Sequence, residues 1–172
     1  MKKLIFISAV SGVGKTTTID YIKNNNLLDD YDIFDIDNLV NIHDYNSDEY
    51  NLFYEDAIKK AVILSKNNNI IIGSCINPTD INKITIPDGI EKIEMVLIYC
   101  SNGELRNRLK ARDESRNCSS DEFINGQIEY QNYMLNHSEL YSFKIDNTSL
   151  DVSEVAKIII NYLKNDTNNN TK

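Results

Sequence analysis

Apolar runs and segments with helical spacing alternate along the chain. The runs at 3–8, 69–74 and 92–100 contain few polar side chains, which is typical of strands buried on both faces of a sheet. Two shorter apolar segments, one ending near Asp35 and one at 143–146, are interpreted as further strands. Strands that alternate with helices predict one parallel sheet with helices on both faces.

The segment 47–67 predicts a helix that begins at Ser47, because serine is a preferred first cap of a helix. Its spacing is expected to place four apolar residues on one face: Leu52, Ala57, Ala61 and Leu64. A helix with one such face is expected to pack on the sheet.

Each of three later helices is indicated by its own pair of residues, which lie three positions apart. The pairs are Ser101 with Glu104, Ser119 with Glu122, and Asp151 with Glu154. The second of these helices is expected to end near residue 137, and the third is the terminal helix. The asparagine-rich segment 166–172 predicts a disordered tail, which leaves residues 1–165 as a single domain.

Composition limits the class of protein. A chain of 172 residues with 41% hydrophobic and 26% charged residues is expected to form one soluble globular domain. The net charge of −8 argues against a long nucleic-acid interface, since phosphate contacts dominate such binding. The three cysteines have no CxxC spacing, so neither a disulfide framework nor a zinc site is expected, and a reducing cytoplasm fits. No apolar run approaches the ~18 residues that span a bilayer.

The N-terminal segment 4–17, LIFISAVSGVGKTT, allows two interpretations: a secretory signal peptide, or a buried strand that leads into a phosphate-binding loop. Residues 9–16 match the pattern G-x-x-x-x-G-K-[ST] except that Ala9 replaces the first glycine. Alanine can take that position if its φ is negative. Cleavage after Ala9 or Ser11 would remove the first strand of the fold. The loop interpretation is therefore favoured, in a cytoplasmic protein.

Each residue type in this loop has a physical role. Gly12 and Gly14 allow successive N–H groups to turn towards an anion, and the following helix adds the positive end of its dipole. Lys15 is expected to reach the β- and γ-phosphates, and the Thr16 hydroxyl to bind Mg²⁺. The residues expected to bind the nucleotide here are Ser11, Gly12, Val13, Gly14, Lys15, Thr16 and Thr17.

The remaining motifs narrow the kind of nucleotide-binding protein. The one candidate for the guanine-selecting N-K-x-D motif, at 82–85, lacks the aspartate and lies too early. With its loop, FDID at 34–37, RLKAR at 108–112 and IDNTSLDVSEVAKII at 145–159, the chain resembles the P-loop small-molecule kinases. That group contains adenylate, shikimate and gluconate kinases and chloramphenicol phosphotransferase. The resemblance implies a three-layer α/β/α sandwich around a five-stranded parallel sheet, with ATP and Mg²⁺ as cofactors.

Two aspartates are candidates for the chemistry of phosphoryl transfer, which needs a carboxylate to take the acceptor's proton. Asp37 is expected to be the base or the anchor of the acceptor hydroxyl, and Asp35 to lie towards Mg²⁺. Residues two apart on a strand share a face, so both are expected to point into one cleft. Which aspartate has which role stays open, and a solvated turn in an acidic protein is the alternative.

Paired arginines precede a predicted mobile lid at about 112–120. Arg108 and Arg112 are expected to share one helix face because they lie one turn apart. By resemblance Arg108 would stack on adenine, Arg112 would reach the transferred phosphate and Arg116 would join it. The alternative is a solvated basic face with pairs such as Glu104–Arg108.

Ligands of open parallel sheets bind at the carboxyl ends of the strands. The acceptor is therefore expected beside Asp37 and the segments 38–54 and 73–77, with His43 as a surface residue. No arginine precedes Arg106, which favours a neutral acceptor over a phosphorylated one. Two lysines, Lys59 and Lys83, remain as possible substitutes.

The sequence thus predicts an ATP- and Mg²⁺-dependent kinase that phosphorylates a hydroxyl of a small molecule such as a nucleoside, sugar acid or antibiotic-like alcohol. The alternatives are a 5′-hydroxyl polynucleotide kinase, a nucleoside monophosphate kinase, or a non-catalytic nucleotide-binding regulator or slow ATPase. The expected partner is a small-molecule substrate, without long nucleic acid or membrane, in a monomer or homodimer.

Overall fold

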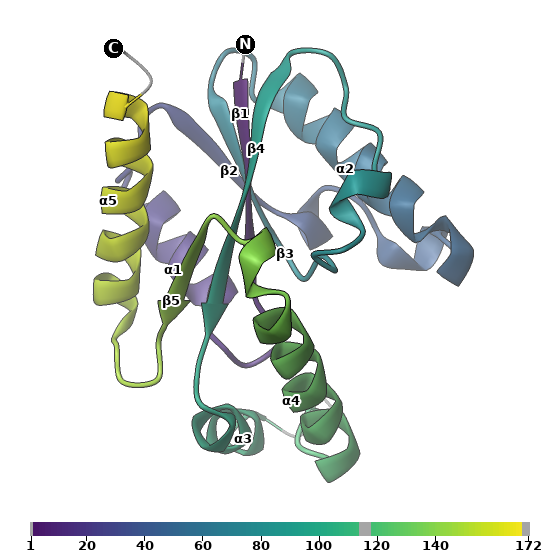
Figure 1. Ribbon diagram of the computed structural model, residues 1–172, viewed down its shortest axis with the longest axis vertical. Helices are drawn as coiled ribbons and strands as arrows, with labels where there is room; N and C mark the ends of the chain where they lie inside the picture. Colours follow the sequence, from purple (N-terminus) through teal and green to yellow (C-terminus); the bar gives the residue numbers. More distant parts are fainter. Residues whose placement is uncertain (1, 114–117, 170–172) are drawn as a thin grey trace.

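A computed structural model describes residues 2–113 and 118–169. Its strands form one parallel sheet in the order β2-β3-β1-β4-β5 (Figure 1). They are β1 (Lys2–Ser8), β2 (Tyr31–Asp35), β3 (Asn69–Ser74), β4 (Ile90–Tyr99) and β5 (Phe143–Asp146). The predicted five-stranded parallel sheet is confirmed.

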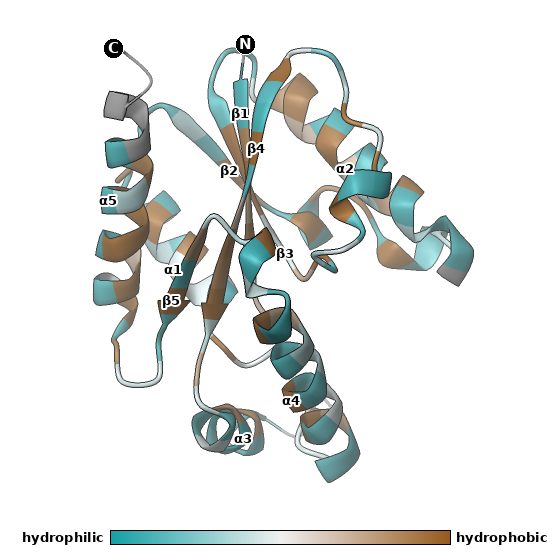
Figure 2. Ribbon diagram, in the orientation of Figure 1, coloured by the Kyte–Doolittle hydropathy of each residue, from teal (hydrophilic) through white to brown (hydrophobic). Residues whose placement is uncertain are grey.

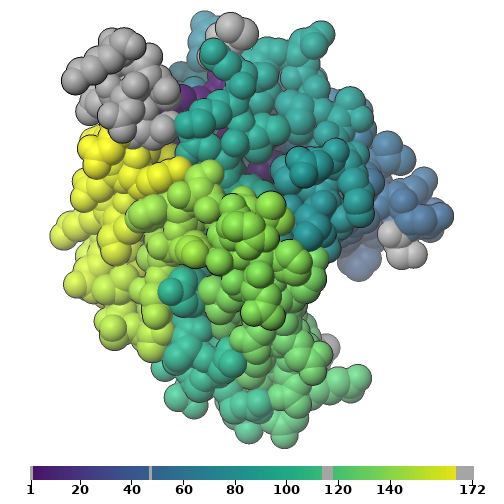
Figure 3. Space-filling view, viewed as in Figure 1, coloured from purple at the N-terminus to yellow at the C-terminus, as the bar shows by residue number. Residues whose placement is uncertain are grey.

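Helices cover both faces of this sheet. They are α1 (Lys15–Asn24), α2 (Tyr50–Leu64), α3 (Asn102–Lys110), α4 (Asp121–Asn136) and α5 (Val152–Asn169). Helices α1 and α5 lie on one side, and α2 and α4 on the other (Figure 1). Helices α3 and α4 lie side by side at the end of the molecule where the strands terminate (Figures 1 and 3). The three-layer α/β/α sandwich is therefore confirmed.

The three central strands form the middle of the core. Their apolar stretches 4–7, 70–72 and 96–98 have at most 1% of each residue exposed, and these strands are largely brown in the hydropathy view (Figure 2). Helices on both faces exclude water from them, so each apolar side chain contributes its full burial energy, roughly 1.5–3 kcal/mol for a large residue. This rigid centre holds the loops at the carboxyl ends of the strands.

Helix α2 is rotated relative to the sequence prediction. Its buried residues are Phe53, Tyr54, Ala57, Ile58 and Ala61. Leu52 and Leu64 are 46% and 60% exposed, so the expectation that they pack on the sheet is wrong, whereas it is correct for the two alanines. The two aromatic rings offer more apolar surface than the leucines, and burying them sets the rotation of the helix.

Several helix starts differ by a few residues from the prediction. Ser47 begins a short 3-10 turn, and the capping box before α2 is made by Asn46 and Glu49. Helix α4 is capped by Ser120, whose Oγ accepts from the N–H of Phe123 at 3.2 Å, one residue after the predicted cap at Ser119. The capping motifs thus predict that these helices exist but misplace the residue that caps each of them.

The C-terminal helix carries the predicted reciprocal cap. The N–H of Asp151 donates to Glu154 at 2.9 Å, and the N–H of Glu154 donates to Asp151 at 3.0 Å. Helix α5 runs to Asn169, so the helical backbone continues into the segment predicted as a tail. Residues 170–172 of that segment lie outside the described residues.

Candidate active site

The glycine-rich loop connects β1 to α1. Gly12 and Gly14 have φ values of 94° and 109°, in the left-handed region where glycine avoids the strain of a side chain. Among the described residues other than glycine, positive φ is confined to Asn26 and Lys66, so Ala9 has an ordinary backbone. Ala9 is 1% exposed, and its N–H donates to the carbonyl of Ser74 at 3.3 Å. Alanine therefore replaces the first glycine without strain, as expected.

Helix α3 packs directly against this loop at Gly12. A Cβ added to Gly12 would lie 2.8 Å from Cγ of Leu109 and 3.0 Å from Cδ1 of Leu105. Both leucines are fully buried, so neither has room to withdraw. The loop can approach α3 this closely because residue 12 has no side chain.

Replacing Gly12 by alanine is therefore expected to lower the free energy of unfolding by about 1–3 kcal/mol, through backbone strain and the clash with Leu109. Urea unfolding followed by circular dichroism measures this. Gly126→Ala is the matched control: Gly126 lies inside α4 and a Cβ there meets nothing within 4 Å. The control should gain roughly 0.5–1 kcal/mol from helix propensity. Equal stabilities of the two variants would contradict this packing.

Arg108 joins the loop to two other segments. Its Nε is 2.7 Å from a carboxylate oxygen of Glu104, and its Nη1 donates to the Val13 carbonyl at 3.0 Å and to Oδ1 of Asn147 at 2.6 Å. Nη2 donates to the carbonyls of Asn147 and Thr148 at 3.0 and 3.4 Å. Asn147 itself donates from Nδ2 to the Val13 carbonyl at 2.7 Å. Arg108 thus ties together the loop, α3 and the connection between β5 and α5, including the predicted Glu104 pair.

Asp35 contacts the first two residues of α1, Lys15 and Thr16. Its Oδ2 accepts from Oγ1 of Thr16 at 3.1 Å and is 3.4 Å from Nζ of Lys15. Hydroxyl and carboxylate oxygens are ligands that Mg²⁺ prefers, so Thr16 and Asp35 fit that ion. Over the described ranges no group of three or more His, Cys, Asp or Glu gathers around a possible metal position. A Mg²⁺ ion held by two protein ligands takes its remaining ligands from phosphate oxygens and water, as is usual in kinases.

Asp37 comes from a turn and not from the strand. Strand β2 ends at Asp35, and Asp37 lies in the 3-10 turn Ile36–Asn38, so the expectation based on strand alternation is wrong. The turn nevertheless keeps the two aspartates together, because Oδ1 of Asp35 accepts from the N–H of Asp37 at 3.3 Å. Asp37 lines the cavity described next, whereas Asp35 faces the start of α1.

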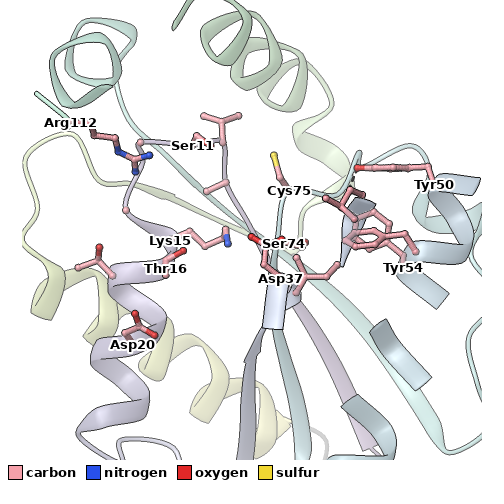
Figure 4. A pocket seen from close by; sticks show the side chains of 18 residues that line it. Ser11, Lys15, Thr16, Asp20, Asp37, Tyr50, Tyr54, Ser74, Cys75 and Arg112 are labelled. Carbon is pink, nitrogen blue, oxygen red and sulfur yellow. Dashed lines mark hydrogen bonds between the residues drawn. The ribbon is translucent and has the colours of Figure 1, made fainter. Parts of the chain in front are cut away.

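One cavity of about 570 Å³ extends from the glycine-rich loop to α2. Figure 4 shows Lys15 and Thr16 on one side, Tyr50 and Tyr54 on the other, and Asp37 with Ser74 between them. Of the predicted site residues, eight line it: Ser11, Gly12, Gly14, Lys15, Thr16, Thr17, Asp37 and Arg112. Val13, Asp35 and Arg108 do not belong to this lining, and Arg116 lies outside the described residues.

Arg112 and Arg108 do not share a helix face as predicted. Helix α3 ends at Lys110, and Arg112 follows it, with its N–H donating to the carbonyl of Leu109 at 3.3 Å. The side chain of Arg112 reaches the cavity near Ser11 (Figure 4), while that of Arg108 bonds to Val13 and Asn147. Of the predicted lid at 112–120, residues 114–117 lie outside the described part of the chain.

The end of the cavity away from the glycine-rich loop is lined largely by apolar and aromatic side chains, among them Ile42, Phe53 and Tyr54. Burial raises the pKa of the Cys75 thiol to about 11, and it also raises the pKa of Tyr54 well above its ordinary value. Both groups are therefore uncharged at neutral pH, and Cys75 is a poor nucleophile. His43 is exposed and lies apart from the cavity lining, in accord with its expected place on the surface.

Gln127 contacts the glycine-rich loop, although no sequence motif predicted this. The N–H of Ser11 in the loop donates to Oε1 of Gln127 at 2.9 Å, across 116 positions of sequence. Gln127 lies on α4, the helix that follows the predicted lid. No local pattern marks a glutamine in a polar helix, so this contact emerges from the fold alone.

Replacing Gln127 by alanine is expected to weaken the binding of ATP about fivefold, since one hydrogen bond that positions the loop is worth about 1 kcal/mol. Calorimetric titration with ATP measures the dissociation constant. Glu129→Ala changes an exposed residue on the same helix and is the control, which should leave the dissociation constant unchanged. The same dissociation constant in both variants would mean that Gln127 does not position the loop.

The sheet order, the loop between β1 and α1, and Lys15 and Thr16 beside Asp35 define a P-loop nucleotide-binding fold. A family model described as an AAA domain matches residues 5–130, and the chain belongs to this family. No curated protein matches the sequence.

Solved structures share the fold. A gluconokinase from Sinorhizobium meliloti 1021 is 14% identical with a TM-score of 0.67, covering 99% of this chain and 98% of its own. A shikimate kinase from Acinetobacter baumannii, in complex with shikimate, is 11% identical with a TM-score of 0.62, over 96% and 94% of the two chains. A shikimate kinase from Bacteroides thetaiotaomicron is 14% identical with a TM-score of 0.58, over 94% and 98%. The resemblance to the P-loop small-molecule kinases is confirmed.

Proposed function

We propose that the protein is an ATP- and Mg²⁺-dependent kinase that phosphorylates a hydroxyl group of a small molecule. One observation carries this proposal: a single cavity contains Lys15 and Thr16 on one side, Asp37 in the middle and side chains of α2 on the other side. A protein that merely binds or slowly hydrolyses ATP has no need of the part of the cavity that lies beyond Asp37. Transfer to an acceptor requires such space.

The residues divide the chemistry between them. ATP supplies the γ-phosphoryl group, and Mg²⁺ neutralises charge on the phosphate oxygens. Lys15 and the amides of the loop hold the donor phosphates, with Thr16 and Asp35 on the metal side. Asp37 orients the acceptor hydroxyl and takes its proton. The acceptor oxygen bonds to the γ-phosphorus as the bond from that phosphorus to the β–γ bridging oxygen breaks, and ADP leaves.

The arginines complete the donor side in this proposal. Arg112 enters the cavity beside the loop and would bind the transferred phosphoryl group, for which a planar guanidinium is well suited. Arg108, held by Glu104 and Asn147, would present one face to adenine. Arg116 is proposed to join Arg112 from the lid.

The cellular setting is part of the proposal. Cys75 and Cys100 form no disulfide in the described part of the chain, which fits a reducing cytoplasm. Within the described ranges, none of the helices has the length and apolar character to cross a bilayer. We propose a small molecule and not a long nucleic acid as substrate, and a monomer or homodimer as the functional unit.

A screen of nucleosides, sugar acids and simple alcohols for stimulation of ADP release tests the function. We expect one chemical class to raise the rate at least about tenfold over basal ATP hydrolysis, because a bound acceptor replaces water at the γ-phosphate. An unchanged rate with every class would favour the slow ATPase instead.

A further inference from the structure

The cavity beyond Asp37 has a lining different from that of the phosphate loop: Ile36, Ile42, Tyr50, Phe53, Tyr54 and Cys75. We propose that the acceptor is an uncharged ring alcohol, meaning an alcohol that also carries an aromatic or heteroaromatic ring, a class that includes nucleosides and benzylic alcohols. This inference rests on the proposed kinase function and narrows its acceptor.

The charged side chains that line the cavity favour an uncharged acceptor. Among the described lining residues the cations are Lys15 and Arg112, and both lie on the side of the phosphate loop (Figure 4). The lysines that might have clamped an anionic acceptor are engaged elsewhere: Nζ of Lys59 is 3.2 Å from Asp56, and Nζ of Lys83 is 2.6 Å from Asp80. Within residues 2–113 and 118–169, a carboxylate or phosphate on the acceptor would therefore find no further cation beside Asp37 to balance it.

The cavity also contains exposed apolar surface that a ligand could cover. Ile42 lines the cavity yet remains 43% exposed, so core packing does not account for its position. Tyr50 on the same wall is half-buried. Covering such surface with an apolar part of a ligand gains about 25 cal/mol per Å². A sugar acid or a polyol would leave this surface unused.

The aromatic wall of the cavity, formed by Tyr50, Phe53 and Tyr54, is held by contacts between its rings. The ring of Tyr54 meets those of Tyr50 and Phe53 edge to face, with centroids 5.0 and 5.1 Å apart, and also meets Phe6 of the central strand at 6.3 Å. The hydroxyls of Tyr50 and Tyr54 are 3.1 Å apart. The wall is thus anchored in the core before any ligand arrives, and a planar ring is the shape that stacks on such a surface at low cost in entropy.

The test measures binding and turnover of matched alcohols at saturating ADP–Mg²⁺ or ATP–Mg²⁺. A panel of nucleosides and benzylic alcohols is paired with counterparts that carry a phosphate or carboxylate, such as thymidine with thymidine 5′-monophosphate and benzyl alcohol with 4-(hydroxymethyl)benzoate. Cyclohexylmethanol tests the aromatic ring itself. Ligand-observed NMR reports binding, and ADP release reports transfer.

Two variants complete the design. Ile42→Ala removes the exposed side chain inside the cavity, and Ile63→Ala removes an isoleucine that is 75% exposed on α2 but outside the cavity lining. We expect Ile42→Ala to weaken binding of the best uncharged ligand about fivefold, since it loses part of one buried side chain. Ile63→Ala should bind as the wild type does, and both should keep their affinity for ADP–Mg²⁺.

The predicted result is that an uncharged ring alcohol binds and that its charged counterpart binds at least about tenfold more weakly, from the unbalanced charge beside Asp37. Three results would overturn the inference: tighter or equal binding of the charged partners, no binding by any uncharged ring alcohol, or equal effects of the two isoleucine variants. Phosphorylation of an organic acid would leave the kinase function standing while this acceptor class failed. Loss of transfer to every acceptor would count against the function itself.

Discussion

Replacing Lys15 by methionine is expected to lower the rate of phosphoryl transfer by at least about a hundredfold, the usual loss when one preorganised electrostatic contact to a transition state is removed. Methionine has an unbranched side chain almost as long as that of lysine but lacks its positive charge. In Lys15, the first residue of α1, this charge lies on Nζ, 3.4 Å from Oδ2 of Asp35. The affinity for ATP should also fall, because the same charge binds the ground-state phosphates. Single-turnover transfer and calorimetric ATP binding measure the two effects separately.

Lys23→Met on the same helix is the matched control. Lys23 is exposed in the last turn of α1, so its loss should leave transfer within about twofold of the wild type. A Lys15 variant that transfers phosphate as fast as the Lys23 variant would show that the loop does not hold the donor phosphates during the reaction.

Asp37→Asn is expected to reduce transfer by about 10²–10⁴-fold while ATP still binds, since asparagine can bind a hydroxyl but cannot accept its proton. Asp37 lines the cavity, whereas Asp35 is engaged with Thr16 and Lys15, so the effects of the two aspartates should differ in kind. Asp35→Asn should raise the Mg²⁺ concentration needed for half-maximal activity. Asp37→Asn should leave that concentration unchanged.

Asp29→Asn controls for the loss of one negative charge in an acidic protein, because Asp29 is exposed in the turn before β2. Its transfer rate should match that of the wild type. Normal turnover in the Asp37 variant would remove Asp37 from the role of base, and a change in its requirement for Mg²⁺ would place it on the metal side instead.

The strands and the phosphate loop could be predicted from the sequence because their signals are local. A run such as 70–72 is buried on both faces, so every position is apolar. The spacing of Gly12, Gly14, Lys15 and Thr16 follows from the backbone that a phosphate cradle requires. The sequence allowed Ala9 in that pattern on the condition of a negative φ, and the structure meets this condition.

Other features depend on contacts between distant segments. The rotation of α2 is set by Phe53 and Tyr54 against the sheet, and helical spacing alone could not rank them above Leu52 and Leu64. Arg112 enters the cavity because α3 ends at Lys110, two residues sooner than the spacing of the arginines suggested. The hydrogen bond between Gln127 and Ser11 joins residues 116 positions apart in the sequence, so no local sequence pattern predicts it.

Transfer of phosphate from ATP to a hydroxyl can be observed by ³¹P NMR of the reaction with a panel of uncharged ring alcohols. We expect a new phosphate monoester resonance that grows in step with ADP and is absent in the Asp37→Asn variant. Growth of inorganic phosphate alone, at the same rate with and without acceptor, would contradict transfer to the acceptor.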